Sequence, residues 1–336
     1  MPFKLKQDRR HYIPRQKRNV VNWRDYDASL RQRGSLTVWF TAGAIEGWRA
    51  EPRTTAGGQA WYSPLAILTA LTLCAVFRLA LRQTEGLIGS VVQLLGLTLA
   101  VPDHSTLSRR AATLEVPRPT RLSGGAAGER EPMHLLVDST GLKLCGAGEW
   151  LIEKHGTHAR RSWRKLHIGL DAETGQIVAA ALTVKDLDDA AQVGPLLDQV
   201  TGEVASFTAD GAYDQGSTYD SVAQLHPDAA VVVPPRATAV PSTMAATDPT
   251  QRDRHLQCVE PRGSPDIAGH GRMGWQKRSG YNTRARVEAA IARWKQVIGD
   301  GLPSRKDERR ATEVAVAVHA LNRMLAFGRP ISVRIA

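Results

Sequence analysis

The chain has 336 residues, enough to bury a substantial core, and this length predicts a two-domain organisation. Hydrophobic residues make up 42% and charged residues 23% of the chain, ordinary values for a globular protein that exclude wholesale disorder. The formal net charge of +11 at pH 7 indicates a polyanionic partner such as a nucleic acid.

Much of this charge lies at the N-terminus, where residues 1–33 contain ten Lys and Arg residues against three Asp. We predict that residues 1–58 form a basic arm, with residues 35–58 rich in turns. The commonest partner of such an arm is a nucleic acid backbone, and a merely solubilising tail is the alternative.

Cysteines and apolar runs bear on the compartment. The three cysteines are widely spaced, form no CxxC motif and are expected to be reduced thiols. The N-terminus lacks the apolar core of a secretory signal. The longest apolar run, residues 65–77, is too short to span a bilayer and predicts a buried helix. We therefore expect a cytoplasmic, nucleoid-associated protein with no membrane partner.

Residues 59–120 are predicted to form a helical DNA-binding domain, because the apolar spacing over residues 61–114 is that of helices. Asp103 is a candidate cap for a short basic helix that carries Arg109 and Arg110. Two short helices joined by a Gly-containing turn resemble a helix-turn-helix, in which these two arginines would contact DNA. An ordinary helical hairpin is the alternative.

A break rich in Gly and charge at residues 121–132 is followed by strand-like patterning. Two apolar strands flank the turn Asp171–Gly175, which predicts a hairpin, and further strands alternate with a helix. The pattern favours an α/β sheet within a domain over residues 131–330. Residues 236–274 show little periodicity, which predicts a long loop in this domain.

Two aspartates share one context in this domain. Asp138 and Asp210 each end an apolar strand and are each followed by turn residues. Strand ends of open α/β sheets are places where functional sites form. The alternative for each is an ordinary cap of the turn that follows the strand.

The segment 281–295 contains four cationic side chains but a single carboxylate, Glu288. On a helix with about 100° per residue, Tyr281, Arg284, Glu288 and Lys295 fall within roughly 60° of one another, beside an apolar stripe. The alternative is a solvated charged face with helical ion pairs.

A third carboxylate brought to the two aspartates would change the electrostatics. Carboxylates about 4 Å apart repel by roughly 1–4 kcal/mol per pair, so Asp138, Asp210 and Glu288 would require a hard divalent cation. Oxygen ligands favour Mg²⁺ or Mn²⁺, and two such ions can support an in-line displacement at phosphorus. Arg284 and Lys295 would then hold the flanking phosphates.

The series Tyr281-x2-Arg284-x3-Glu288-x6-Lys295 resembles the Y-R-E-K signature of bacterial insertion-sequence transposases of the DDE type. The stretches "LLVDSTGLKL…GEW" and "TADGAYD" resemble the two aspartate motifs of that family, in the same order. Further stretches resemble the insertion-sequence-five family in particular, namely "NWRDYDASLRQRGSLTVW", "LRQTEGLIGS", "VPDHSTLSRR" and "ATEVAVAVHALNRML". The resemblance extends from about residue 20 to the C-terminus.

This resemblance implies an α/β, ribonuclease H-like catalytic core preceded by a basic, mainly helical DNA-binding region. Asp138, Asp210 and Glu288 would be the catalytic triad that binds two ions, Mg²⁺ or Mn²⁺. The enzyme would bind the terminal inverted repeats of its own element as double-stranded DNA, cleave to expose 3′-hydroxyl ends and join those ends to target DNA. Two copies would bring the paired ends together in a synaptic complex as a homodimer.

The same resemblance implies that Tyr281, Arg284 and Lys295 contact DNA near the cleaved end. Trp150 would stack on an unpaired base at the transposon end, or else lie in the core. Two other functions remain open from the residues alone: a non-catalytic DNA-binding regulator, and a ribonuclease H-like nuclease that cuts without strand transfer.

Overall fold

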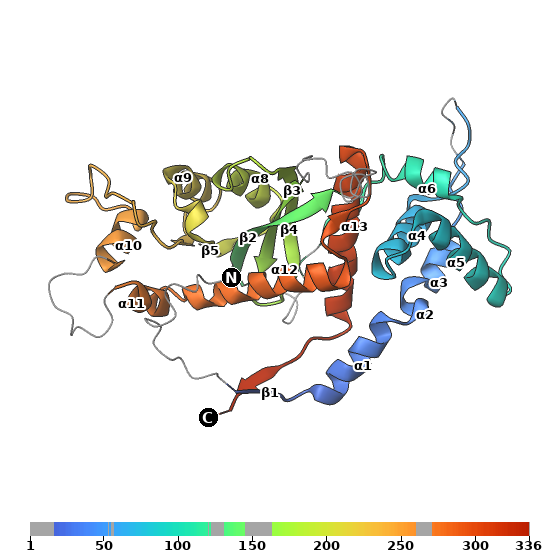
Figure 1. Cartoon of the computed structure of the whole chain (residues 1–336), viewed down its shortest axis with the longest axis horizontal. Coiled ribbons are helices and arrows are strands. Elements are labelled where there is room, and N and C mark those ends of the chain that lie inside the picture. Colours follow the sequence, from blue (N-terminus) through green and yellow to red (C-terminus); the bar gives the residue numbers. More distant parts are fainter. Residues whose placement is uncertain are drawn as a thin grey trace, which may run out of the picture.

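A computed structural model of the chain describes residues 17–52, 54, 57–119, 121, 131–144, 163–259 and 271–335. The predicted DNA contact Trp150 lies outside these residues, as do residues 1–16 of the predicted basic arm. The described residues form a mixed β-sheet with helices on both faces, and a group of N-terminal helices lies beyond the covering helix α13 (Figure 1).

The sheet is built around a long central strand, β2. Its strands in the described residues are β2 (Met133–Leu144), β3 (Trp163–Asp171), β4 (Ile177–Val184), β5 (Val204–Thr208), β6 (Ala230–Val232) and β7 (Gly301–Leu302). The order is β4-β3-β2-β5-β6, with β7 beside the far end of β2. Strands β2, β3 and β4 run antiparallel, whereas β5 and β6 run parallel to β2. The predicted hairpin and the predicted α/β sheet are thus confirmed.

Alternate residues of β2 face opposite sides of the sheet, as a strand requires. Leu136 belongs to the core cluster under α12 (Ala285–Val297) and α13 (Asp307–Ala326). Leu135 and Val137 belong to the cluster under α8 (Val193–Leu197) and α9 (Gly216–Leu225). Asp138 therefore points to the side of the sheet that α12 covers, and this parity positions the site.

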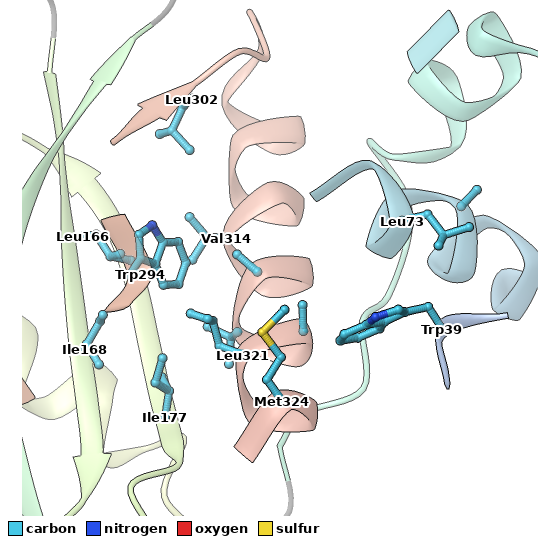
Figure 2. Close-up of a cluster of buried hydrophobic side chains, with 14 of the residues drawn as sticks. Trp39, Leu73, Leu166, Ile168, Ile177, Trp294, Leu302, Val314, Leu321 and Met324 are labelled. Atoms are coloured by element: carbon cyan, nitrogen blue, oxygen red, sulfur yellow. The ribbon is translucent and has the colours of Figure 1, made fainter. Parts of the chain in front are cut away.

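The helical N-terminal domain is joined to the sheet by a continuous apolar core (Figure 2). Its helices are α1 (Trp23–Arg33), α2 (Leu36–Trp39), α3 (Ala42–Glu46), α4 (Pro64–Val76), α5 (Leu81–Leu94) and α6 (His104–Arg110). The apolar helix α4 begins at a Ser63 cap and packs against α13. Trp39 and Leu73 lie on one side of α13 and Trp294 on the other. Together with Leu321 of α13 itself they belong to a single cluster.

The described part of residues 17–58 contains helices where turns were predicted. Residues 23–46 are largely helical, and Trp39 and Trp48 are buried, with the Trp48 indole donating to the Ala100 carbonyl at 2.7 Å. Short helices interrupted by Gly and Thr give no clear 3.6-residue period, so the sequence pattern suggested turns. The strand β1 (Arg18–Val20) pairs antiparallel with β8 (Ser332–Arg334), which ties this region to the C-terminal segment.

The predicted loop over residues 236–274 also contains regular structure, namely α10 (Gln251–Val259) and α11 (Gly271–Arg278). The two helices pack on each other, and Trp275 of α11 is buried. Asp253 is buried as well, and its carboxylate is satisfied by hydrogen bonds from both Ser242 and Thr250. Both helices are short and polar, which explains why hydrophobic periodicity did not reveal them.

Three short 3₁₀ helices complete the described elements: η2 (Ala190–Gln192), η3 (Gly211–Tyr213) and η4 (Tyr281–Arg284). Within the described residues, the only segment with the length and apolar composition of a membrane span is the pair α4 and α5, which bends by 112° at its break. Most of α4 is buried in the core described above.

Candidate active site

The two predicted aspartates lie side by side because of strand register. The parallel strands β2 and β5 pair Leu136 with Thr208, and Asp138 and Asp210 each lie two residues beyond this pair. Asp210 follows the end of β5 as predicted, whereas Asp138 does not end its strand, because β2 continues to Leu144 through its pairing with β3. Asp210 then caps η3, accepting from the Ala212 N–H at 2.9 Å.

Helix α12 brings the third carboxylate. Its apolar side, with Val287 and Trp294 fully buried, packs over β2 and β3. Glu288 lies in the first turn of the helix, with its side chain 57% exposed. The helix predicted over residues 281–295 therefore exists, with its first residues in η4 and its apolar stripe on the sheet.

The three carboxylates converge on a single guanidinium group. Nη2 of Arg284 lies 3.0 Å from Oδ2 of Asp138 and 3.6 Å from Oδ2 of Asp210. Nη1 of Arg284 donates to Oε1 of Glu288 at 2.5 Å. The carboxylates that are 72 and 78 residues apart along the chain thus share one cation, and the structure brings the predicted triad together.

Burial and charge act against each other at this cluster. Burial raises the pKa of the Asp138 carboxyl, and Asp210 adds to this, whereas Arg284 and the Ser139 N–H oppose it. Burial alone would lower the pKa of Arg284, but Asp138, Tyr281, Asp210 and Glu288 raise it overall. Arg284 therefore remains a cation, and its contact with Asp138 favours the ionised form of that carboxyl.

Tyr281 lies at the cluster and Lys295 does not. The Tyr281 ring packs against Trp275 in a tilted arrangement, with centroids 5.3 Å apart. The Tyr281 hydroxyl is hydrogen-bonded to Arg284, and burial is the main cause of the raised pKa of Tyr281. Lys295 is seven residues beyond Glu288 on α12, a distance of about 10 Å along the axis. It is exposed, and it helps Lys143 to lower the pKa of Asp300.

Arg109 and Arg110 end α6, which lies at the opposite end of the molecule from the start of α12 (Figure 1). They line a cavity of about 950 Å³ together with Trp61 and Tyr62. Arg110 donates to the Tyr62 carbonyl at 3.1 Å, and Asp103 caps α6 as predicted. Residues 95–103 separate α5 from α6, a longer connection than the turn of a helix-turn-helix.

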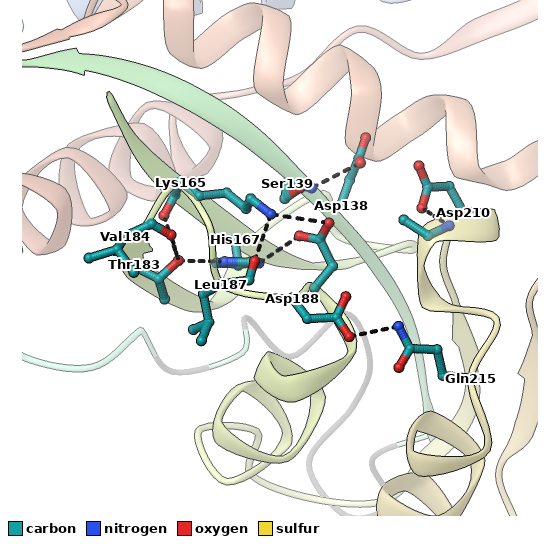
Figure 3. Close-up of polar contacts among 12 residues, drawn as sticks. Asp138, Ser139, Lys165, His167, Thr183, Val184, Leu187, Asp188, Asp210 and Gln215 are labelled. Atoms are coloured by element: carbon teal, nitrogen blue, oxygen red, sulfur yellow. Dashed lines mark hydrogen bonds and ion pairs between the residues drawn. The ribbon is translucent and has the colours of Figure 1, made fainter. Parts of the chain in front are cut away.

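The sequence pattern did not reveal a buried polar cluster that lies behind the triad, on the other face of the sheet (Figure 3). Nδ1 of His167 is 3.4 Å from Oδ1 of Asp189, and Lys165 donates to the Leu187 carbonyl at 2.8 Å. Burial lowers the pKa of His167 to about 4, although Asp189 opposes this. Polar residues at positions 165 and 167 of an apolar strand are the signal that could have identified the cluster.

This cluster supports the segment beside the site. Asp189 precedes η2, so its contacts hold the turn after β4 against β3. The adjacent Asp188 accepts from the Gln215 side chain at 2.7 Å, just after η3. The contacts of Asp188 and Asp189 therefore support the backbone that follows Asp210, although neither residue contacts the triad.

The donor set of the triad suits a hard divalent cation, because all three side chains offer carboxylate oxygens. Among the described residues, no three potential ligands are grouped as a ready-made metal site. The carboxylates are instead gathered around the Arg284 cation, which shows that the fold already places a positive charge among them. The donor set thus suits Mg²⁺ or Mn²⁺ in chemistry, whereas in this structure the three described carboxylates are spaced around Arg284 and not around an ion position.

Comparison with known proteins places this arrangement in a family. A family model described as a transposase DDE domain matches residues 129–323, and another with the same description matches residues 31–147. A piggyBac transposase synaptic complex with hairpin DNA is similar at 9% identity and a TM-score of 0.41, covering 92% of this chain and 76% of that chain. A Mos1 transposase paired-end complex with the left transposon end is similar at 11% identity and a TM-score of 0.23, covering 97% and 91%.

Proposed function

Because the chain belongs to the family of transposases with a DDE domain, we propose that it is an active enzyme of the insertion-sequence-five kind. It binds the terminal inverted repeats of its element, cleaves there to expose 3′-hydroxyl ends and joins those ends to target DNA. The observation that supports this proposal is the convergence of Asp138, Asp210 and Glu288 on one cation between the central strand β2 and helix α12.

Asp138, Asp210 and Glu288 are the residues that would hold two divalent ions, Mg²⁺ or Mn²⁺. Such ions supply activation of the attacking oxygen and stabilisation of the leaving oxygen in phosphoryl transfer. The protein's own contribution is to hold the carboxylates at fixed positions, through β2–β5 register for the aspartates and through the buried face of α12 for the glutamate.

Cationic and polar side chains near the triad would hold the DNA. The planar fork of Arg284 suits a phosphate group, and the Tyr281 hydroxyl beside it offers a further donor. Lys295, two turns further along α12, would contact the backbone away from the cut. Trp150 is proposed to stack on an unpaired base at the transposon end.

The N-terminal domain would grip the repeat at a distance from the cut. Arg109 and Arg110 line a cavity beside the exposed Trp61, and α6 is far from the triad, so these residues would contact a different part of the repeat. We also propose that two copies form a homodimer when the ends are synapsed, and that the protein acts in the cytoplasm, associated with the nucleoid.

The test replaces Asp138 by Asn, which preserves shape but removes a charged ligand. With a duplex that carries the element's terminal repeat, D138N should bind as the unmodified protein does, but lose cleavage and end joining by about 10²-fold or more. The matched control is D186N, because the Asp186 side chain is 82% exposed and contacts Lys185 and not the triad.

Two alternative functions give different results in the same assays. A non-catalytic regulator would bind the repeat but show no cleavage in the unmodified protein at any Mg²⁺ concentration. A nuclease without strand transfer would cleave the duplex, yet yield no joined product when pre-cut ends and a plasmid target are supplied at saturating Mg²⁺. The proposed function requires both cleavage and joining, and both must depend on Asp138.

A further inference from the structure

Arg284 contacts three carboxylates, whereas an ordinary ion pair joins one cation to one carboxylate. Its two Nη atoms contact Asp138, Asp210 and Glu288, three acids from a strand, a strand end and a helix. Side chains of like charge so close together would repel one another without a cation between them. In this state of the protein, the guanidinium supplies that cation.

The guanidinium is not fully satisfied by these partners. Its Nε is buried and makes no hydrogen bond to the described residues. An arginine fork binds a phosphate best through two parallel N–H groups, and Nε with one Nη forms such a pair. The structure thus leaves Arg284 one donor that the carboxylates do not use and that a phosphate oxygen could accept.

The balance of charge at the cluster also indicates that other cations could take the place of Arg284. One guanidinium against three carboxylates leaves an excess of negative charge when all three acids are ionised. The cluster is open on the helix side, since the side chains of Asp210 and Glu288 are 37% and 57% exposed, whereas Asp138 and Arg284 lie deeper, at 13% and 14%. Small cations can approach from that side, whereas Arg284 is the one cation among the described residues that pairs with Asp138.

We propose that Arg284 is the internal counter-ion of the triad in the DNA-free protein, and that a DNA phosphate withdraws it so that divalent cations can take its place. Cation binding and DNA binding would then be coupled through one side chain. This inference rests on the proposed function, because it assumes that the triad binds divalent ions.

The local backbone is suited to such a movement. Arg284 lies at the junction of η4 and α12, and η4 follows Gly280, whose φ of 69° is in the left-handed region that favours glycine. Its neighbour Arg286 is exposed and donates to the Ala172 carbonyl, with no contact to the triad. The two arginines therefore provide a matched pair of variants on one helix.

The experiment measures Mn²⁺ binding by the loss of the free-ion electron paramagnetic resonance signal, first without DNA. R284Q should bind Mn²⁺ roughly 5- to 150-fold more tightly than the unmodified protein, the range usual for coupled sites. R284K keeps a charge but loses the fork, so its affinity should be intermediate. R286Q should match the unmodified protein, and circular dichroism establishes that all variants are folded.

The second measurement adds a duplex that carries the terminal repeat, with the Mn²⁺ bound by DNA alone subtracted. The duplex should raise the Mn²⁺ affinity of the unmodified protein and of R286Q, but not that of R284Q. By reciprocity, Mn²⁺ should tighten duplex binding to the unmodified protein by the same factor, as measured by fluorescence anisotropy.

Two failures are distinguishable. If D138N and E288Q bind Mn²⁺ as tightly as the unmodified protein when the duplex is present, the triad is not the ion site and the proposed function itself is overturned. If those variants lose Mn²⁺ while R284Q and the unmodified protein bind it equally in the absence of DNA, the proposed function stands and the counter-ion role of Arg284 is overturned.

Discussion

Replacing Trp39 by Ala tests whether the N-terminal helices and the sheet share one cooperative core. Trp39 of α2 is 2% exposed, and its indole donates to the Arg33 carbonyl at 2.8 Å. Its ring meets Phe327 edge-on with centroids 5.8 Å apart, and the Arg323 guanidinium lies 5.4 Å from its centre. Figure 2 shows the ring facing α13 near Met324, where the N-terminal domain meets the covering helix.

The expected loss in the free energy of unfolding is about 3–5 kcal/mol, the usual cost of truncating a buried tryptophan. Within that total, the edge-on ring pair accounts for about 0.5–1.5 kcal/mol and the cation–π contact for about 0.5–2 kcal/mol. The Arg33 carbonyl also loses its indole donor. Domains are commonly stable by about 5–15 kcal/mol, so this loss removes a large share.

The assay is urea unfolding followed by circular dichroism, together with hydrogen exchange of the β2 and β3 amides. Because Trp39 and the sheet residues belong to one cluster, W39A should lower the protection of the sheet as well as that of α4. The matched control is W61A, since Trp61 is 78% exposed and its loss should change stability by less than about 0.5 kcal/mol. Unchanged protection of β2 and β3 in W39A, with faster exchange confined to α4, would refute the shared core.

Two further predictions concern the buried polar groups of the sheet. Asn322 of α13 pairs with both the N–H and the carbonyl of Ile177 in the buried core, so N322L should cost about 2 kcal/mol or more in urea unfolding. Q199L should cost less, because Gln199 also makes two bonds, to the Ala180 N–H and the Pro195 carbonyl, but in a more exposed place. His167 takes up its proton near pH 4 when folded but at its ordinary pKa of 6.5 when unfolded, so acid favours the unfolded state. Between pH 7 and pH 5 the unmodified protein should therefore lose about 2 kcal/mol more than H167Q, and equal losses would show that His167 does not titrate in this way.

Strands, turns and the convergence of the aspartates followed from local patterns in the sequence. The turn after Asp171 predicted the hairpin, and Asp210 follows the end of β5 as predicted. Asp138 was wrongly expected to end its strand, because β2 continues through the polar residues after it by pairing with β3. The pairing of β1 with β8 is different, because it joins segments more than 300 residues apart and neither strand has a hydrophobic pattern of its own. Its existence depends on where α1 and α13 end, which only the packed core determines.

Short elements were missed for a related reason. Helices α2 and α3 have four and five residues, too few for a 3.6-residue period to emerge. Their place in the core depends on Trp39 and Trp48, whose indole N–H groups find carbonyl partners in other parts of the domain. The polar cluster around His167 likewise joins two strands and a turn, so no single segment displays it.

The two interpretations of the segment 281–295 do not exclude each other. The helical ion pair between Arg284 and Glu288 is present at the i,i+4 spacing, as the alternative of a solvated charged face required. The second Nη of the same guanidinium reaches Asp138 and Asp210, which come from a different layer of the fold. Helical spacing fixes the first contact, whereas strand register and the burial of Trp294 fix the others. A basic segment with one central acid is therefore consistent with a site in which the cation and the carboxylate are held by the same helix for exchange with incoming charges.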